Sequence, residues 1–428
     1  MSATIIRNGR VIDPANKRDE VADLYIADGK IVGSKSAIPN PKSQIEEIDA
    51  GGLIVAPGLI DMHVHLREPG FSHKETIESG ARAAAAGGFT TVVCMPNTSP
   101  VADNPSTIAW IKDRAAEAAC VNVLPTGAIS KNLAGEELAP IGSLEKAGVV
   151  AITDDGHCIQ NHEVMRRAVE YARMVDLPVL DHCQDYNLVG NGVVHEGYWS
   201  TLLGLPGWPT AGEEAIVMRN ILLAELCDHP IHCQHVSAAG SVRLIREARE
   251  RGVKISGEVC PHHIALTDEA IQNFDTNYKM NPPLRAQPDV DALLEGIADG
   301  TLSILCSDHA PHADFEKEVE FDLAPFGIIG LETELGLFID LLVHKHAKID
   351  IVRLIETYTT EPARLLKLDA GTLSPGVRAD VTLIDPALKW TVSVDQFQSV
   401  ARNSPFDGWK LKGRAVRTIA GGKTVWKL

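Results

Sequence analysis

Residues 59–65 read LIDMHVH, a short apolar run that ends in two histidines before a Pro-Gly turn. His63 and His65 stand two apart, so in a strand both side chains project to the same face and can reach one metal ion. Asp61 shares that face. A single strand histidine is usually a hydrogen-bonded core residue, so the spacing of the pair is what favours a metal site.

Further apolar runs follow, with helical stretches between them. The runs are residues 90–96, 121–129, 149–156, 178–183, 231–237, 254–263 and 302–312. Their near-continuous apolar character is typical of strands buried on both faces. The expected helices include residues 74–86, 163–174, 213–226 and 241–251. This alternation predicts repeated βα units and a parallel sheet.

Two architectures give such an alternation, a (β/α)₈ barrel and an open doubly wound sheet. Barrel enzymes take reactive groups from the carboxyl ends of several strands, whereas an open sheet concentrates its site at one switch point. Here His and Asp residues end at least five of the runs, and no Gly-x-Gly-x-x-Gly follows the early strands. We therefore predict a TIM-like (β/α)₈ barrel over residues 56–364, without a dinucleotide cofactor.

The two chain ends share a different pattern, of short β-type runs joined by glycine turns. Asp28-Gly29 separates LYIA from KIVG, and Gly421-Gly422 stands in the closing stretch RTIAGGKTVWKL. We expect the two ends to form one small β-sandwich domain, made of residues 1–55 and 365–428.

The composition excludes several classes of partner. The formal net charge is −17, from 57 acidic against 40 basic side chains, and no Lys/Arg block occurs, so nucleic acid and anionic membrane are poor partners. The beginning MSATIIRNGRVIDP lacks a signal-peptide apolar region and any membrane-spanning run, so we expect a cytoplasmic location. The eight cysteines include no Cys-x-x-Cys pair, which is typical of buried thiols rather than a disulfide framework.

Other strand ends supply the ligands that a dinuclear metal site needs. Asp154 and Asp155 follow the fourth run, His182 the fifth, His235 the sixth and Asp308 the eighth. Neutral imidazole and carboxylate are natural zinc ligands. For any one of these residues alone, helix capping or a buried hydrogen bond explains it equally well. Their gathering at one barrel mouth favours the metal site, although strand alternation does not tell which aspartate faces inward.

As an ordered set, the motifs resemble those of the class I dihydroorotase family within the amidohydrolase superfamily. The stretches are DMHVHLREPG at 61, MPNTSP at 95, TDDG at 153, DHCQD at 181, HVSAAGSV at 235, KMNPPLR at 279 and SDHAPH at 307. The likeness extends from about residue 50 to about residue 330, with weaker support at the chain ends. Many superfamily members carry a carbamylated lysine after the fourth strand. The acidic end of this strand argues against a hydantoinase.

The resemblance implies a zinc centre of one or two ions, with two favoured. The implied ligands form two sets that share Asp155, namely His63, His65 and Asp308 for one ion and His182 and His235 for the other. Asp308 is also implied as the general base that accepts a proton from the attacking hydroxide and returns it to the ring nitrogen. His262 and His263, after the seventh run, stay outside the ligand set as structural or orienting residues.

The resemblance also implies the substrate, (S)-dihydroorotate, whose ring opens reversibly to N-carbamoyl-L-aspartate on the route to UMP. Its carboxylate needs a donor-rich clamp, and a guanidinium suits that geometry. The implied substrate contacts are His65, Arg67, Asn97, Asn281, His312, Phe326 and Gly327. Without the resemblance, Asn97 is equally a turn residue and Arg67 a surface ion pair. Residues 313–330 are numerous enough for a closing loop.

Two other functions stay open at this point. An allantoinase or hydantoinase would keep the zinc and change the substrate, but Arg67 and the acidic fourth strand argue against it. A catalytically silent, dihydroorotase-like scaffold for aspartate transcarbamoylase would lack ligands, and none is missing here. The resemblance further implies a homodimer, or association with aspartate transcarbamoylase.

Overall fold

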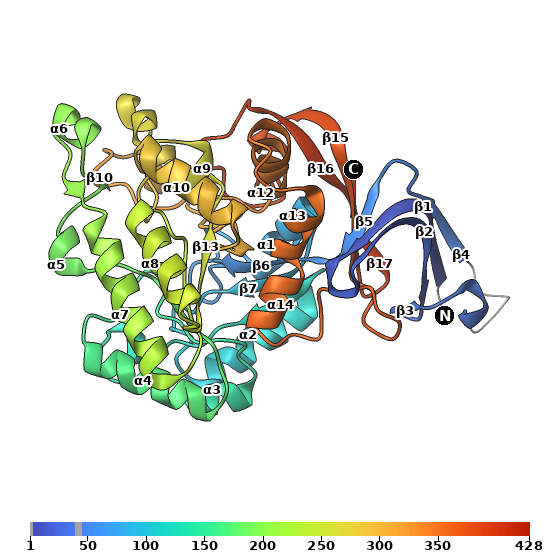
Figure 1. Cartoon of the computed structure of the whole chain (residues 1–428), viewed down its shortest axis with the longest axis horizontal. Coiled ribbons are helices and arrows are strands. Elements are labelled where there is room, and N and C mark those ends of the chain that lie inside the picture. Colours follow the sequence, from blue (N-terminus) through green and yellow to red (C-terminus); the bar gives the residue numbers. More distant parts are fainter. Residues whose placement is uncertain (1–2, 39–44) are drawn as a thin grey trace.

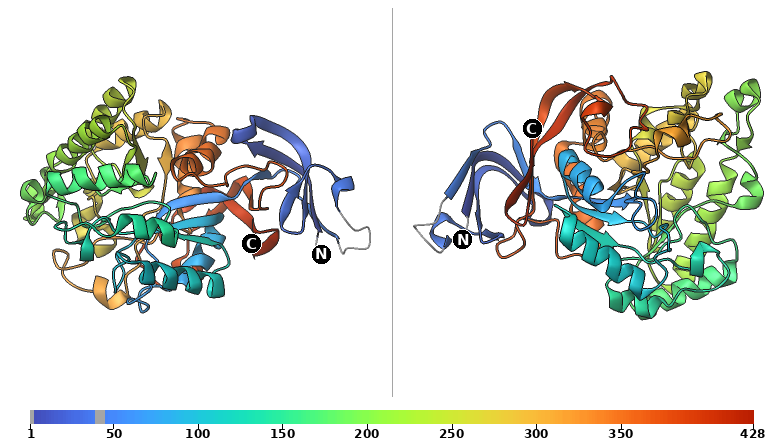
Figure 2. Two further views of the ribbon diagram at one scale, coloured as in Figure 1. Left: turned by 90° about the horizontal axis from the view of Figure 1, so that it is seen from below. Right: turned by 180° about the vertical axis from the view of Figure 1, so that it is seen from behind.

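The computed structural model describes residues 3–38 and 45–428, and Figure 1 shows that they form two parts lying side by side. The larger part has short strands at its centre and helices around them. The smaller part is a sheet that carries both ends of the chain. The views from below and from behind in Figure 2 show the same division. The chain therefore has a mixed α/β fold.

Short parallel strands form the centre of the larger part, in two sheets. The first has the order β6 (Leu59–Val64), β7 (Phe89–Cys94), β8 (Asn122–Pro125), and the second β14 (Ile304–Leu305), β13 (Ile255–Val259), β12 (Ile231–Cys233), β9 (Val179–Asp181). Single parallel bridges join Gly127 to Ile152, Ile152 to Val179 and Val64 to His309. These bridges connect the two sheets at both of their edges.

The fourth expected strand, residues 149–156, is the one that forms no regular ladder. It makes only the two bridges at Ile152. The carboxylate of Asp154 accepts hydrogen bonds from the backbone N–H groups of Ile129 (2.7 Å) and Ser130 (3.0 Å), so a side chain holds this segment where a strand ladder was expected. The last expected strand is also short, because its later residues continue as a loop that carries Asp308.

Helices cover the outside of the parallel strands. The longer ones are α1 (Ile77–Gly87), α2 (Pro105–Ala118), α3 (Ile141–Ala147), α4 (His162–Met174), α7 (Ala211–Cys227), α8 (Ala239–Glu250), α10 (Gln287–Ala298) and α13 (Ile351–Tyr358). The shorter ones are α5 (Tyr186–Val189), α6 (Tyr198–Leu203), α9 (His262–Ala265), α11 (Asp314–Lys317), α12 (Glu334–Phe338) and α14 (Thr360–Leu365). The four helices expected from the sequence are confirmed as α1, α4, α7 and α8. The first of them, α1, ends with the C-cap residue Gly88, which lies in the left-handed region at φ 100°.

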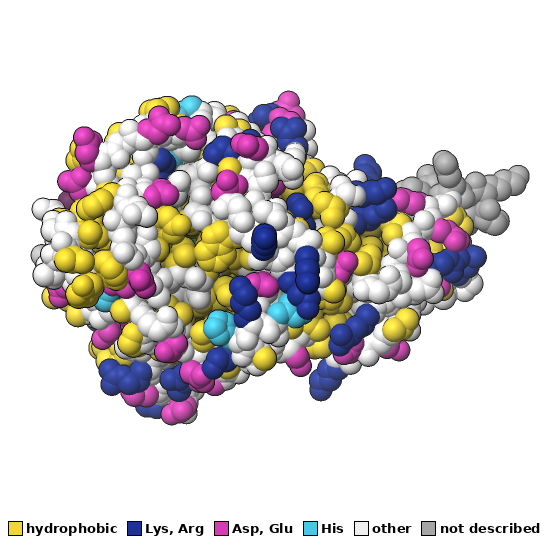
Figure 3. Space-filling view, turned by 90° about the horizontal axis from the view of Figure 1, so that it is seen from above, with side chains coloured by type: hydrophobic (Ala, Val, Ile, Leu, Met, Phe, Trp, Pro, Cys, Tyr) yellow, Lys and Arg dark blue, Asp and Glu magenta, His cyan; other side chains and the backbone are white. Residues whose placement is uncertain are grey.

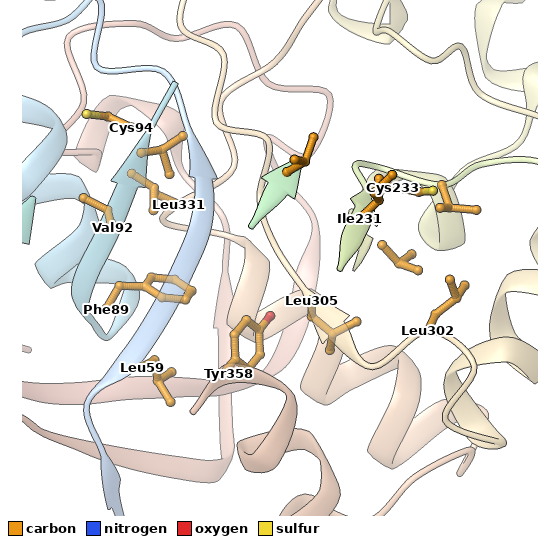
Figure 4. Close-up of a cluster of buried hydrophobic side chains, with 14 of the residues drawn as sticks. Leu59, Phe89, Val92, Cys94, Ile231, Cys233, Leu302, Leu305, Leu331 and Tyr358 are labelled. Atoms are coloured by element: carbon orange, nitrogen blue, oxygen red, sulfur yellow. The ribbon is translucent and has the colours of Figure 1, made fainter. Parts of the chain in front are cut away.

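The apolar faces of these elements meet in a continuous core. Figure 4 shows one part of it, where Leu59 of β6, Phe89 of β7 and Tyr358 of α13 lie close together. The rings of Phe89 and Tyr358 meet edge to face, with centroids 5.6 Å apart, and both side chains are fully buried. Strands with no exposed face explain the near-continuous apolar runs of the sequence.

Both ends of the chain build a separate eight-stranded sheet. Its order is β17 (Lys423–Lys427), β16 (Lys410–Ala420), β15 (Val381–Thr391), β5 (Ile54–Pro57), β1 (Ala3–Asp13), β2 (Arg18–Ala27), β3 (Lys30–Val32), with β4 (Ile45–Asp49) also paired to β1. The join between the ends is the antiparallel pair of β5 and β15. The expected hairpins at Asp28-Gly29 and Gly421-Gly422 are confirmed, and all four residues have positive φ.

Residues 392–409, between β15 and β16, leave this sheet and pack on the larger part; we call them the crossover segment. Its apolar side chains Phe397, Ala401 and Phe406 form one buried cluster with Met280 and Ile328 of the larger part. The crossover segment therefore contacts the loops that follow the parallel strands.

Across the described ranges, no helix combines the length and the apolar character needed to cross a membrane. All eight cysteines are free thiols, and seven of them are buried. Burial raises the pKa of the Cys94 thiol to about 12, as expected for a core residue rather than a reactive one.

Candidate active site

Side chains from the carboxyl ends of the parallel strands converge on one cavity of about 180 Å³. The strand ends β6, β9 and β12 each supply one histidine, and the loop after β14 supplies Asp308. The lining contains every residue expected to bind metal or substrate except His63, which lies fully buried beneath it. Residues separated by up to 262 positions in the sequence are therefore brought together, as the barrel hypothesis requires.

Asp155 lies at the centre of the metal-ligand candidates. Its Oδ1 atom is 3.3 Å from Nε2 of His63, 3.6 Å from Nε2 of His235 and 3.8 Å from Nδ1 of His182, and its Oδ2 atom is 3.4 Å from Nε2 of His65. One carboxylate thus faces four imidazoles. Its neighbour Asp154 points away, toward the backbone around residue 130, and lies outside the cavity.

Asp308 completes the group on the other side of the cavity. Its Oδ1 atom lies 3.1 Å from Nε2 of His65 and 3.5 Å from Nε2 of His63. Burial alone would raise the pKa of Asp308, but the adjacent His63 and His65 lower it to about 2, so the carboxylate is ionised at neutral pH. Ligand atoms of His63, His65 and Asp308 lie within 4.8 Å of one another, as do those of His63, Asp155 and His235.

The donor chemistry of this group fits a divalent metal ion. Among the described residues, Nε2 of His63 and Oδ1 of Asp155 are buried without a hydrogen-bond partner. A buried polar atom without a partner costs free energy, and both atoms are ordinary zinc donors. The unpaired atoms face each other, so a cation between them would satisfy both.

Glu258 of β13 is a part of the site that the sequence reasoning missed. Its Oε1 atom lies 2.6 Å from Nδ1 of His63, and its Oε2 atom lies 3.1 Å from Nε2 of His232. A carboxylate on one ring nitrogen fixes the tautomer and leaves the opposite nitrogen, Nε2 of His63, free for a metal ion. The available signal was an acid inside the otherwise apolar run 254–263.

Three of the site residues have an unusual backbone conformation. Arg67, His235 and Asp308 have φ angles of 61°, 33° and 47°. Positive φ in a residue other than glycine costs on the order of 1–3 kcal/mol, and such residues cluster at functional sites. Other residues with positive φ lie in turns and helix ends elsewhere in the fold, and these three place local backbone strain at the cavity.

Arg67 and His312 line another part of the cavity, where Arg67 supplies a positive charge. Arg67 donates from Nε to the backbone oxygen of Pro311 (3.1 Å), and burial lowers its pKa to about 10, which leaves it charged at neutral pH. Burial and the nearby cations Arg67, Lys74 and Lys317 lower the pKa of His312 to about 2, so this imidazole is neutral. Nε2 of His312 lies 2.8 Å from the backbone oxygen of Phe326.

The two asparagines of the cavity contact metal-ligand candidates or their neighbours. Oδ1 of Asn97 lies 2.9 Å from Nδ1 of His65. Asn281 donates from Nδ2 to Oε1 of Gln184 (3.3 Å), and the same oxygen lies 2.8 Å from Nε2 of His182. Gln184, in the motif DHCQD, was not singled out from the sequence.

The residues that the sequence left unassigned have structural contacts. Asp61 accepts hydrogen bonds from the backbone N–H of His63 (3.0 Å) and from the hydroxyl of Ser307, which ties the first parallel strand to the last. His262 and His263 form another buried group with Cys260, near enough to the site for the charge of His235 to act on both rings, and Nε2 of His263 lies 3.0 Å from the backbone oxygen of Pro282.

Comparisons with known proteins agree with this geometry. The dihydro-orotase-like family matches residues 52–241, and the amidohydrolase family matches residues 211–425. Dihydroorotases of Syntrophotalea carbinolica and Pelotomaculum thermopropionicum are 50% and 51% identical to this chain, over 99% and 98% of both chains.

Solved structures of related proteins have the same fold. A dihydropyrimidinase from Brevibacillus agri matches with a TM-score of 0.85 at 26% identity, over 99% of this chain and 95% of that one. An L-hydantoinase from Arthrobacter aurescens matches with a TM-score of 0.88 at 24% identity, over 99% of this chain and 96% of that one. By its full-length identity to curated relatives, the chain belongs to the dihydroorotase family of amidohydrolases.

Proposed function

We propose that this protein reversibly hydrolyses the ring amide of (S)-dihydroorotate to N-carbamoyl-L-aspartate, in pyrimidine synthesis toward UMP. The observation that carries the proposal is one small cavity with two chemically different walls. The Asp155 carboxylate and the imidazoles of His65, His182 and His235 form one wall, with His63 beneath it, and the guanidinium of Arg67 lines the other. The first suits amide hydrolysis assisted by a metal ion, and the second suits a carboxylate on the substrate.

The scaffold we propose is a closed (β/α)₈ barrel over residues 56–364. The single bridges at Ile152 and between Val64 and His309 support it, because they lie where the two parallel sheets must meet to close a ring. We also propose that residues 1–55 and 365–428 form a small β-sandwich domain, of which residues 1–2 and 39–44 lie outside the described part. Its separate apolar cluster, which includes Ile6, Val11 and Val381, supports this division.

We propose zinc as the metal, with two ions bridged by Asp155. His63, His65 and Asp308 would hold one ion, and His182 and His235 the other. When bound, zinc supplies Lewis acidity that polarises a carbonyl oxygen and lowers the pKa of water toward neutrality. The nitrogen-rich donor set favours zinc over magnesium or calcium, which prefer oxygen ligands.

Asp308 is the proposed proton carrier of the reaction. Its carboxylate would accept the proton of the attacking water and deliver it to the ring nitrogen as the amide bond breaks, so one group serves as base and then as acid. The 3.1 Å contact with His65 restricts its orientation. Asn97 in turn restricts the His65 ring through its 2.9 Å contact.

The substrate carboxylate is assigned to Arg67, Asn97 and His312, and the ring to Asn281. His65 and the backbone groups of Phe326 and Gly327 complete the proposed contacts. Gly327 suits close backbone approach, because a Cβ added there would lie 2.6 Å from Cβ of Ala310 and its φ is 116°.

For the assembly we propose a homodimer in the cytoplasm. The exposed side chains Met218, Leu222 and Leu226 are spaced four apart on one face of α7 and suit an interface. Figure 3 shows hydrophobic side chains on the surface of the larger part, from its far end to its middle. Association with aspartate transcarbamoylase is the alternative assembly. Sedimentation of the purified chain, alone and with that enzyme, distinguishes the two.

The test of the proposed function is ring opening of dihydroorotate by zinc-replete protein, followed by ultraviolet absorbance, with hydantoin and allantoin as rival substrates. We expect turnover of dihydroorotate only. Turnover of a rival alone would make the protein a hydantoinase or allantoinase. Silence on all three would indicate a scaffold without activity.

A further inference from the structure

We propose that Asn403 is a positioning residue for the substrate site, although it touches neither the cavity nor the metal-ligand candidates. It comes from the crossover segment and joins two stretches of the loop after β14, residues 310–312 (the first arm) and residues 326–329 (the second arm). The spacing between these arms sets where His312 and the backbone of Gly327 lie. The inference rests on the proposed function, because it assigns Asn403 to the part of the cavity that would bind the substrate carboxylate.

The side-chain amide of Asn403 makes hydrogen bonds to both arms of that loop. Its Nδ2 atom donates to the backbone oxygens of Ala310 and Gly327, both at 3.1 Å, and its Oδ1 atom accepts from the backbone N–H of His312 at 3.1 Å. Its own backbone oxygen accepts from the N–H of Ile329 at 3.0 Å. Asn403 is buried, so water cannot replace these bonds.

An asparagine is well matched to this position. Its amide carries two donors at one end and an acceptor at the other, and here two carbonyl oxygens face the donors while one N–H faces the acceptor. An aspartate has the same size but would turn a second oxygen toward the oxygens of Ala310 and Gly327. A leucine would remove all three side-chain bonds and leave buried backbone groups without partners.

The spacing between the two arms decides the orientation of His312. Its backbone N–H is on the first arm, while its ring contacts the backbone oxygen of Phe326 on the second arm, at 2.8 Å. The arms are already in close contact, since a Cβ on Gly327 would meet Ala310 and would lie 3.5 Å from Nε2 of His312. If the arms separate, the ring loses its contact with Phe326 and turns relative to Arg67.

The crossover segment is held in place by contacts other than those of Asn403. The buried carboxylate of Glu75 accepts hydrogen bonds from the hydroxyl of Ser399 and from the N–H of Val400 (3.2 Å). Glu332 accepts from the N–H groups of Gln398 (2.8 Å) and Ser399 (3.1 Å). A change at Asn403 alone should therefore leave the segment docked and the protein folded.

The experiment compares the full-length, zinc-loaded variants Asn403→Asp and Asn403→Leu with wild type and with a control, Asn122→Leu. Asn122 donates from Nδ2 to the oxygens of Thr90, Thr91 and Asp380 at the amino end of β8, far from the cavity mouth. The control removes as many side-chain bonds without touching the loop. Kinetics on dihydroorotate are measured together with backbone amide exchange of residues 310–312 and 326–329.

We expect both Asn403 variants to raise KM for dihydroorotate by about tenfold, the effect of one or two lost hydrogen bonds, with a smaller change in kcat and unchanged zinc content. Amide exchange should accelerate in residues 310–312 and 326–329 of these variants and not in the control. Equal rates of amide exchange at these residues in the Asn403 variants and in the control would overturn the proposal. A loss of kcat and of bound zinc at unchanged KM would also overturn it. If wild type fails to open dihydroorotate, the proposed function falls, and the exchange measurement still tests the positioning.

Discussion

At the scale of single residues, Asp308 has two separate duties in our proposal, as a metal ligand and as the proton carrier. Replacing it by asparagine keeps its size and removes its ability to accept and return a proton. We expect kcat for dihydroorotate to fall about 10²- to 10⁴-fold, the usual contribution of general acid–base catalysis. The assay needs zinc-reconstituted protein with its metal-to-protein ratio measured. Wild-type kcat in this variant would assign the proton transfer to another group.

Arg67 determines, in our proposal, which ring the site accepts. Arg67→Met removes the charge and the bidentate geometry while keeping a long apolar side chain. We expect kcat/KM for dihydroorotate to fall by about 10²-fold or more, because charge-assisted bonds to carboxylates are worth about 1.5–3 kcal/mol each and the guanidinium makes up to two. Any residual hydrolysis of neutral dihydrouracil should change little. Equal losses for both substrates would mean that Arg67 maintains the loop around Pro311 instead.

The sequence pattern predicted the metal-ligand side of the cavity because strand ends carry positional information, whereas the substrate contacts came from the family resemblance. His65, Asp155, His182, His235 and Asp308 follow apolar runs directly, and parallel strands bring their carboxyl ends to one edge. Residues that do not lie at strand ends were not predicted. Asn403 lies in a segment with no motif of its own, and its partners are backbone atoms, which leave no trace in a sequence.

At the scale of elements, a buried lysine holds the two ends of residues 313–330 together. Lys317 donates from Nζ to the backbone oxygens of Pro325 (2.9 Å) and Gly327 (3.0 Å). Burial, followed by the charge of Lys279, lowers the pKa of Lys317 to about 7. A neutral amine still has two N–H donors, so the contacts to Pro325 and Gly327 survive loss of the proton.

This lysine predicts a pH dependence of stability. Above pH 7 the folded chain releases the proton, while the unfolded chain keeps it until about pH 10.4, so the unfolded state binds more protons and stability rises with pH between these values. Relative to Lys317→Met, wild type should gain up to about 1.4 kcal/mol per pH unit in this window. Urea unfolding of both proteins at several pH values gives the difference. Parallel curves would place the pKa of Lys317 near that of an exposed lysine.

The fourth expected strand shows what periodicity cannot tell. Residues 149–156 have the apolar character of a buried strand, but Asp154 binds the backbone N–H groups of Ile129 and Ser130 in place of a ladder. The sequence alone does not tell whether Asp154 or Asp155 turns toward the backbone. The resemblance to a known family selected Asp155, and the structure turns that residue to the cavity.

At the scale of the whole molecule, the cavity predicts a strong link between metal and stability. At least five buried acidic and imidazole side chains crowd around it, and a bound cation would satisfy the unpaired Nε2 of His63 and Oδ1 of Asp155. A metal present at roughly a thousand times its Kd stabilises the folded state by about 4 kcal/mol. Chelation should therefore lower Tm by several degrees in calorimetry, and zinc should restore it better than magnesium. An unchanged Tm after verified metal removal would contradict the link.

The division into two parts was predictable from the change of pattern along the chain. The contacts between the two parts were not. Hairpin turns and strand runs mark the two ends as sheet, and their pairing through β5 and β15 follows from both being short of partners. The crossover segment was counted with the small domain on the same grounds. Its contacts with Met280 and Ile328 depend on side-chain packing between distant residues, which no local pattern encodes.

The crossover segment also sets the order in which the protein is completed during its synthesis. All metal-ligand candidates lie between residues 63 and 308, so the strands that carry them leave the ribosome well before Asn403 and can pair early. β5 must also wait for a late partner, because β15 is made only shortly before Asn403. The substrate pocket is therefore assembled last. A chain cut short before Asn403 would carry every metal-ligand candidate and lack a fixed place for the substrate carboxylate.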